Sequence, residues 1–317
     1  MRWCPGLDEE LQGFADALSV APERVFYYGM TWLLPRCSHI ALLPGVTACD
    51  RPLLARNYEF NHEAEDFALI RTSVAGKYTH MGTSVLHFGR DDGFNEHGLA
   101  VTMSSCGFPV GPMPYMRAPK ISGLQFWAVI RALLENCRDV AECLDYMRGM
   151  PIAFNLNLML LDQSGRAALV ETLDGRMAVK QIDGSGEQTL YATNHPVLPE
   201  LVPHEPQALV HSLRRYEWIG EQMGNPSSVT VEQLQTMLLA KYPDGLCCHY
   251  FEEFFGTTKS MVIDPAASII HLCWGGRAEN GWQTFDIREP LDGAATDIQL
   301  NFEKADPAIH RFQPLQI

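Results

Sequence analysis

Several features that would place this sequence in other protein classes are missing from it. No stretch of the 317 residues approaches the ~18 consecutive apolar residues that mark a membrane-spanning helix. The sequence also has no Walker A element, no G-x-G-x-x-G after a predicted strand and no G-x-S-x-G nucleophile elbow. It therefore lacks the motifs of P-loop nucleotide-binding proteins, dinucleotide-dependent oxidoreductases and α/β-hydrolases.

Basic residues are also scarce. The chain has 24 Lys and Arg against 38 Asp and Glu, a formal net charge of −14, and no basic stripe. This charge argues against nucleic acid and anionic membranes as partners, because both attract basic surfaces. The first ten residues lack the apolar segment of a secretory signal, and the nine cysteines show no disulfide-framework spacing. Together these features predict free thiols in a reducing cytoplasm.

The order of the predicted elements indicates an α+β protein. Apolar periodicity predicts helices over residues 7–18, 209–223 and 231–239, a short helix after Pro22, and helices opened by capping pairs. The capping pairs are Ser122 with Gln125, Asp139 with Glu142, and Thr230 with Gln233. Strands are predicted over residues 38–43, 52–55, 67–74, 78–88, 99–105, 158–161, 167–172, 177–182, 190–193, 259–263, 269–274, 284–287 and 297–302.

Blocks of strands alternate with blocks of helices, which favours layered α+β architecture over βαβ units. No internal repeat or low-complexity linker divides the chain. Residues 107–120 contain four prolines and are predicted to form a long ordered loop that borders a binding site.

One predicted hairpin carries a candidate nucleophile. Its first strand begins at Cys37, Pro44-Gly45 breaks that strand, and the returning strand ends in Arg56-Asn57-Tyr58-Glu59-Phe60. A thiol at a strand start, close to a guanidinium and a carboxylate, is an arrangement suited to nucleophilic catalysis. A buried cysteine is, however, more often a small apolar filler, and local context alone does not decide between the two interpretations.

Three motifs in the same order resemble those of the N-terminal-nucleophile (Ntn) cysteine hydrolases. They are Arg36-Cys37-Ser38 with the segment 55–60, the segment 93–101 (Gly-Phe-Asn-Glu-His-Gly-Leu-Ala-Val), and Ala192-Thr193-Asn194-His195-Pro196. The acyl-coenzyme A:6-aminopenicillanic acid acyltransferase group is the most similar branch, and penicillin V acylase and bile-salt hydrolases are more distant. The resemblance implies a four-layer αββα sandwich of two antiparallel sheets. It also implies an N-terminal helical propeptide over residues 1–36 and a single Ntn-hydrolase domain over 37–317.

The same resemblance implies roles for four catalytic residues. Cys37 would be the nucleophile, and its own α-amine, released by autoproteolysis, the general base. Glu59 stands where the family has an Asp that orients the nucleophile, and Asn194 matches the oxyanion donor. Arg215 aligns with a late family Arg, with Arg214 as its rival.

Further residues are implied to contact the substrate. Arg56 would hold the thiolate and substrate by charge, Ser105 would line the pocket, and aromatic residues would accommodate an apolar acyl group. These aromatic residues are Tyr58, Phe60, Phe108 and Tyr115, with the loop 108–116 forming part of the pocket. No cofactor or metal is implied: Cys247-Cys248-His249 lacks a second ligand pair at zinc-site spacing. Asn95 is interpreted as a structural turn residue.

The sequence thus predicts an Ntn cysteine amidohydrolase or acyltransferase acting on a linear, non-peptide amide bond. It would form a thioester acyl-enzyme from a small-molecule amide or acyl donor, after autoproteolysis before Cys37. The choice between hydrolysis and acyl transfer is left open, as is assembly into a homo-oligomer. Two alternatives stand beside it. One is an unprocessed, non-catalytic binding protein, because Arg36 and Glu59 depart from the family pattern; the other is a cysteine peptidase that uses a histidine base.

Overall fold

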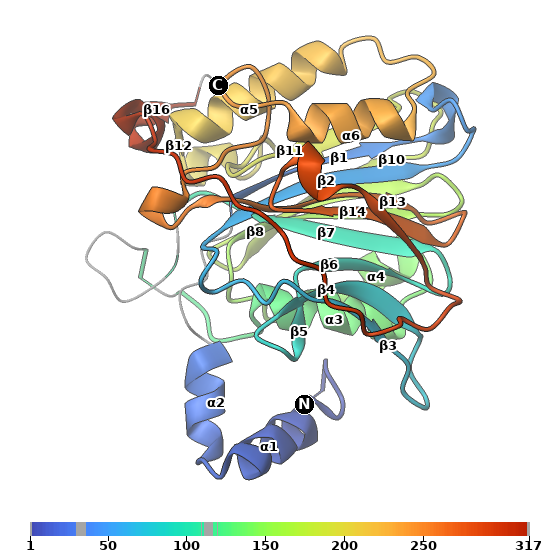
Figure 1. Ribbon diagram of the computed structural model, residues 1–317, viewed down its shortest axis with the longest axis vertical. Helices are drawn as coiled ribbons and strands as arrows, with labels where there is room; N and C mark the ends of the chain where they lie inside the picture. Colours follow the sequence, from blue (N-terminus) through green and yellow to red (C-terminus); the bar gives the residue numbers. More distant parts are fainter. Residues whose placement is uncertain (1, 30–35, 109, 111–116, 119, 316–317) are drawn as a thin grey trace.

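Two antiparallel β-sheets packed face to face, with helices on their outer faces, form the body of the molecule (Figure 1). The computed structural model describes residues 2–29, 36–108, 110, 117–118 and 120–315. Helices α5 (Val210–Gln222) and α6 (Val231–Leu239) cover the first sheet. Helices α3 (Phe126–Asn136) and α4 (Val140–Tyr146) cover the second. This arrangement confirms the predicted αββα fold class.

The first sheet contains the predicted nucleophile hairpin at its centre. Its strand order is β11 (Thr189–Ala192), β1 (Arg36–Leu42), β2 (Leu53–Phe60), β13 (Gly256–Asp264), β14 (Ile269–Trp274) and β15 (Gln283–Asp286). All of its strand pairs are antiparallel. The hairpin is thus flanked by strands from the second half of the chain, which bring distant residues to Cys37.

The second sheet lies beneath the first. Its order is β10 (Arg176–Ile182), β9 (Ala167–Leu173), β8 (Leu156–Asp162), β7 (Leu99–Ser105), β6 (Asp92–Asn95), β4 (His80–Val85) and β3 (Leu69–Thr72). The short β5 (Gly89–Arg90) pairs with β4. A separate pair joins β12 (Gln207–Leu209) to β16 (Phe312–Pro314) near the C-terminus.

The register of the hairpin determines which side chains face the second sheet. Cys37 pairs with Tyr58, and Arg36 pairs with Glu59. Side chains alternate between the two faces of a strand, so Cys37 and Tyr58 share one face and Glu59 lies on the other. Ile40, which shares the face of Glu59, packs in the cluster formed with α5 and α6. The thiol therefore points between the sheets, whereas Glu59 points toward the helices.

Two sequence predictions of secondary structure are wrong. The helix expected after Ser122 begins only at Phe126, and its N-terminal residue Gln125 makes no capping hydrogen bond. The preceding Leu124 instead exchanges backbone hydrogen bonds with the 151–153 segment. Residues 297–301 do not form a strand either, because the Asn280 side chain bonds both the N–H and the C=O of Gln299.

The other two predicted helix caps are confirmed, whereas one predicted strand is shorter than expected. Asp139 caps α4, and Thr230 with Gln233 forms the expected reciprocal capping box of α6. The strand expected over residues 78–88 ends at Val85, since Leu86 and His87 have positive φ angles of 58° and 62°. A non-glycine residue in that conformation does not continue a strand.

The N-terminal helix α1 (Leu7–Leu18) packs against the body of the protein. Its buried residues Leu7, Leu11 and Ala15 belong to the same hydrophobic cluster as α3. Glu10 accepts a hydrogen bond of 2.9 Å from Arg131 of α3, and the Tyr146 hydroxyl donates to the carbonyl of Trp3 at 2.7 Å. Helix α2 (Pro22–Gly29) follows. The segment predicted as a propeptide thus contributes to the core.

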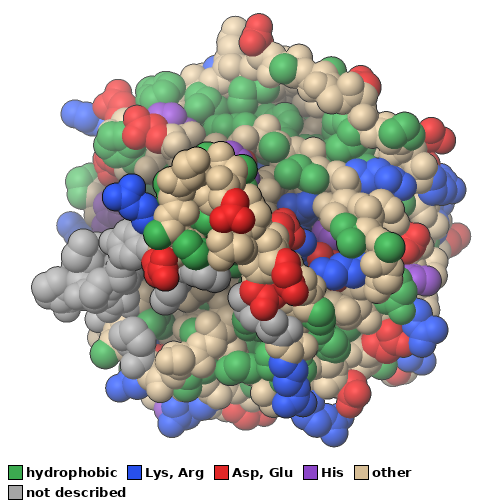
Figure 2. All heavy atoms as spheres, turned by 90° about the horizontal axis from the view of Figure 1, so that it is seen from below, with side chains coloured by type: hydrophobic (Ala, Val, Ile, Leu, Met, Phe, Trp, Pro, Cys, Tyr) green, Lys and Arg blue, Asp and Glu red, His purple; other side chains and the backbone are tan. Residues whose placement is uncertain are grey.

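Seen from the side of α1, acidic and basic side chains are interspersed over this face, and no extended basic patch appears on it (Figure 2). No helix among the described residues combines the length and the apolar character needed to span a bilayer.

Helix α1 offers a matched test of its packing. Leu11 is 2% exposed and Leu18 of the same helix is 56% exposed. We expect Leu11→Asp to lower the free energy of unfolding by about 3–4 kcal/mol, because it buries a charge and removes apolar contacts. Leu18→Asp should change it by less than about 0.5 kcal/mol. Urea unfolding measures both, and equal losses would show that α1 is not packed as described.

Candidate active site

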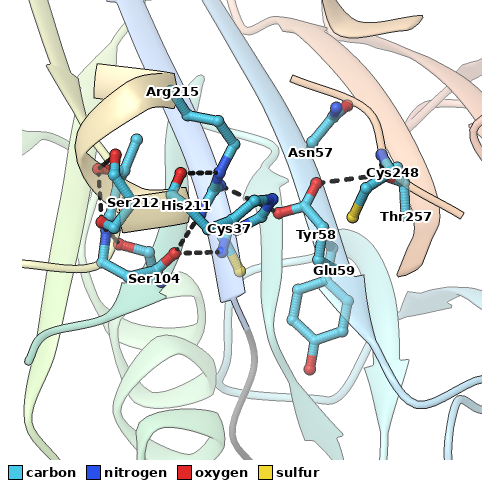
Figure 3. Close-up of polar contacts among 12 residues, drawn as sticks. Cys37, Asn57, Tyr58, Glu59, Ser104, His211, Ser212, Arg215, Cys248 and Thr257 are labelled. Carbon is cyan, nitrogen blue, oxygen red and sulfur yellow. Dashed lines mark hydrogen bonds and ion pairs between the residues drawn. The ribbon is translucent and has the colours of Figure 1, made fainter. Parts of the chain in front are cut away.

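The thiol of Cys37 lies at the start of β1, fully buried between the two sheets (Figure 3). The Nη2 atom of Arg56 donates a hydrogen bond to its sulfur at 3.4 Å. Burial raises the pKa of Cys37 to about 12, although the neighbouring guanidinium acts in the opposite direction. In the uncleaved chain the thiol is therefore protonated at neutral pH.

A buried ionic cluster fixes Arg56. Its Nη1 atom donates to the carbonyl of Asp91 at 2.7 Å and pairs with the Asp92 carboxylate at 2.5 Å. The guanidinium also lies 4.6 Å from the ring centroid of Tyr58, and Lys259 Nζ lies 4.3 Å from the same centroid. Asp92 and Lys259 were not singled out in the sequence, although Asp92 directly precedes the Gly93-Phe94-Asn95 motif.

Asn194 holds the backbone nitrogen of Cys37. Its Oδ1 atom accepts a hydrogen bond from that N–H at 3.1 Å and another from Arg215 Nη2 at 2.7 Å. Both partners are donors, which fixes the orientation of the amide. The Nδ2 atom then donates to the backbone oxygen and hydroxyl of Ser105, at 3.2 and 3.1 Å. The acceptor end of Asn194 thus faces the atom that would become the α-amine.

Arg215 bonds Asn194 and pairs with Glu59. Its side chain reaches from helix α5 toward Glu59 of the sheet (Figure 3). Its Nη1 atom lies 3.3 Å from Glu59 Oε2, and Thr257 donates to the other carboxylate oxygen at 3.2 Å. The side chains of Glu59, Arg215 and Thr257 are fully buried. The longer side chain of Glu59, where the family has Asp, contacts Arg215 and Thr257 and makes no hydrogen bond to Cys37 among the described residues.

Burial raises the pKa of Glu59 from 4.5 to about 7, although Arg215 and Thr257 favour the ionised form. The folded state therefore binds more protons than the unfolded state between pH 4.5 and 7. The contribution of Glu59 to the free energy of unfolding is present below pH 4.5 and is lost as the pH rises through 7.

This linkage gives a testable pH dependence. We expect the urea midpoint of wild-type protein to fall from pH 5 to pH 7.5 more steeply than that of Glu59→Gln, which has no carboxyl to ionise. Glu171, whose pKa burial also raises to about 7, adds a slope of the same sign to both proteins. Identical slopes in the two proteins would contradict the buried, destabilised carboxylate.

A cavity of about 250 Å³ lies beside this network. Ser105 and Asn194 line it together with Arg36. Residues of β12, η5 (Pro307–His310) and β16 also line it, and none of these was predicted from the sequence. The lining residues are Arg36, Ser105, Gly107, Phe108, Asn194, Gln207, Ala208, Leu209, His310 and Phe312. No local pattern marks the C-terminal members, because they reach the cavity only through the β12–β16 pairing.

The aromatic residues expected at the pocket divide into two sets. Tyr58 and Phe60 are 1% and 6% exposed and pack in the core, so they do not line this cavity. Phe108 does line it, and its ring stacks on Phe312 with centroids 4.1 Å apart. Residues 109 and 111–116, including Tyr115, lie outside the described residues. Substrate contact by Tyr58 and Phe60 stays a prediction.

The histidine-base alternative finds little support around Cys37. His39 shares its strand face, but its ring nitrogens contact Thr102 and Ser104, and burial lowers its pKa to about 3. In the part of the chain that the structure describes, the hydrogen-bonded thiol–imidazole pair is Cys247 with His249, at 3.4 Å. Burial raises the pKa of Cys247 to about 12, although a hydrogen bond with Thr257 acts in the opposite direction.

The structure thus brings together Cys37, Arg56, Asn194, Ser105, Arg215 and Glu59, all from the sequence predictions. Arg214, the rival of Arg215, is exposed, whereas Arg215 is fully buried in the network.

Two solved structures of one hydrolase support the architecture. The fold is similar to a mutant of the conjugated bile acid hydrolase from Clostridium perfringens, with a TM-score of 0.56 at 14% sequence identity. That similarity covers 86% of this chain and 99% of the other. A second variant of the same hydrolase has a TM-score of 0.56 at 15% sequence identity, and the similarity covers 85% of this chain and 99% of the other. Penicillin V acylase from Agrobacterium tumefaciens has a lower TM-score of 0.43 at 18% sequence identity, over 75% of this chain and 83% of the other.

A sequence search of curated proteins finds no match. The family model for acyl-coenzyme A:6-aminopenicillanic acid acyl-transferase matches residues 46–279, well over half of the chain. The chain belongs to the acyl-coenzyme A:6-aminopenicillanic acid acyl-transferase family and has the Ntn-hydrolase fold.

Proposed function

We propose that this protein is an Ntn cysteine amidohydrolase or acyltransferase that acts on a linear amide bond through a thioester on Cys37. One observation carries the proposal. The two reactive atoms of Cys37 each have a dedicated partner, Arg56 at 3.4 Å from the sulfur and Asn194 at 3.1 Å from the nitrogen. A structural cysteine needs neither contact.

Activation requires cleavage of the bond between Arg36 and Cys37. The thiol attacks the carbonyl carbon of Arg36, the C–N bond breaks, and the nitrogen takes the thiol proton. The carbonyl is then bound to sulfur as a thioester. Water hydrolyses this thioester, which releases the Arg36 carboxylate and regenerates the thiol beside a free α-amine.

The freed α-amine of Cys37 would supply a general base next to the thiol. An α-amine has a pKa of ~7.7–8.0, so near neutral pH a substantial fraction can accept the thiol proton. Asn194 Oδ1 would hold this amine by accepting one of its hydrogens, which leaves the nitrogen lone pair available. Arg56 would stabilise the thiolate by charge, and its own position is fixed by Asp92.

The substrate would place its acyl group in the cavity beside Asn194. Phe108, Leu209 and Phe312 give this cavity an apolar lining, which suits an apolar acyl group. For the tetrahedral oxyanion, the Nδ2 group of Asn194 would turn its hydrogen bond from Ser105 to the substrate oxygen; such a donor is worth about 3–4 kcal/mol. The family match, to a transferase acting on 6-aminopenicillanic acid, and the similarity to a conjugated bile acid hydrolase support acyl chemistry.

Trapping the acyl-enzyme tests the proposal. The protein is incubated with a set of N-acyl amides and activated acyl esters, quenched in acid and digested. We expect an acyl adduct on the peptide that begins with Cys37. Adducts on the peptide with Cys247 and Cys248 would support the histidine-base peptidase instead. The absence of both adduct and turnover would support a non-catalytic binding protein.

A further inference from the structure

Arg36 is the one arginine or lysine among the residues that line the cavity. Its guanidinium stacks on Phe255, with Cζ 4.6 Å from the ring centroid, and its Nη1 atom is buried without a hydrogen-bond partner. Within the described part of the chain, it forms no ion pair with a carboxylate. His310 differs in this respect, since its Nε2 atom lies 3.2 Å from Glu253.

The charges around Arg36 do not balance. Two guanidinium groups, Arg36 and Arg215, share this region with one carboxylate, Glu59. Glu59 is already paired with Arg215 and also accepts from Thr257. Burial and the charge of Arg215 lower the pKa of Arg36 to about 10, so it still carries its charge at neutral pH. Arg36 is partly exposed, but a guanidinium with a buried, unbonded nitrogen and no carboxylate partner is costly unless an anion accompanies it.

We propose that the uncleaved chain binds a small apolar monocarboxylate in this cavity, with the carboxylate paired to Arg36 and the apolar part against the Phe108–Phe312 stack. A carboxylate matches the planar donor fork of arginine, which binds it with two parallel hydrogen bonds. The volume of about 250 Å³ accommodates a ligand the size of a phenyl-substituted short-chain acid. This site does not depend on catalysis by Cys37.

Cleavage before Cys37 would change the site. The carboxylate that pairs with Arg36 belongs to the same chemical class as the acid that amide hydrolysis releases. After cleavage, Arg36 is no longer covalently joined to β1, even where α1 stays packed on the body, so the cavity would lose the cation that binds the acid. The cleaved protein would then release a carboxylic acid that the uncleaved chain retains.

Binding of a matched pair of probes tests the proposal. Cys37→Ala keeps the chain uncleaved, and calorimetry with 3-phenylpropanoate and 3-phenylpropanamide compares a carboxylate with its neutral isostere. We expect at least a tenfold lower Kd for the carboxylate, a difference that an arginine–carboxylate pair supplies. Adding Arg36→Gln should abolish the preference. Arg24→Gln, the same change at an exposed arginine of α2, should leave it intact.

Equal affinities of the two probes, no binding of either, or a preference that survives Arg36→Gln would each overturn the proposal. Wild-type protein gives a separate comparison. If its mass shows cleavage, the tenfold preference should disappear, and a preference that survived would place the cation elsewhere and refute the site. An uncleaved wild-type chain would contradict the proposed activation, and the carboxylate site would then be decided by Cys37→Ala and its Arg36→Gln derivative.

Discussion

Replacing Cys37 by alanine is expected to abolish cleavage of the chain and to lower amide turnover by at least about a thousandfold. The thioester cannot form without the sulfur, and removing a covalent nucleophile typically costs this much or more. No other described thiol has a guanidinium within hydrogen-bonding distance. Steady-state hydrolysis of an N-acyl amide, with intact mass as a second readout, measures both effects.

A second buried cysteine provides the control. Cys143 of α4 is also fully buried, lies in the cluster that contains Cys37, and has no role in the proposed chemistry. Cys143→Ala should retain cleavage and turnover. If Cys37→Ala kept its activity, or if Cys143→Ala lost it while remaining folded, Cys37 would not be the nucleophile.

Replacing Arg215 by methionine is expected to lower the free energy of unfolding by about 3–5 kcal/mol above pH 7, where Glu59 is ionised, because it leaves that carboxylate buried without its ionic partner. The same change removes the donor that orients Asn194, and turnover should therefore fall even where the protein is folded. Urea unfolding and kcat/KM on the same preparation separate the two effects.

Two further variants make the Arg215 prediction specific. Arg214→Met is the same substitution one residue away at an exposed position, and it should change stability by less than about 0.5 kcal/mol. Adding Glu59→Gln to Arg215→Met should recover most of the lost stability, since no unpaired charge then remains. A double variant that is as unstable as Arg215→Met would show that the buried pair is not the cause.

The hairpin, and the residues that the structure brings together around Cys37, could be singled out in the sequence because their signals are local. Cys37 and Arg56 stand in short motifs on adjacent strands, and the Pro44-Gly45 turn sets their separation. Asn194 stands at the end of β11, which pairs with β1. Each motif could therefore be aligned with the family without knowledge of the fold.

Long-range pairing explains what the sequence did not predict. Lys259 reaches Tyr58 only because β13 pairs with β2, and Phe312 reaches the cavity only because β16 pairs with β12. The resemblance placed Glu59 beside the nucleophile, but strand alternation puts the thiol and this carboxylate on opposite faces of the sheet. Glu59 is therefore linked to the backbone nitrogen of Cys37 only through Arg215 and Asn194.

The packing of α1 also affects how cleavage is detected. Because Leu7, Leu11 and Ala15 are buried against the body, a cleaved N-terminal segment would stay associated under native conditions. Gel filtration of the folded protein would then show little change, and cleavage has to be measured on unfolded chains.

The intact mass of wild-type protein under denaturing conditions, with sequencing of the new N-terminus, tests the central claim most directly. The account predicts a chain of 281 residues that begins with Cys37, the 317 residues less the first 36, roughly 4 kDa lighter than the 35.5 kDa full chain. Cys37→Ala should keep the full mass. A full-length mass for both proteins would contradict activation of Cys37 as an N-terminal nucleophile.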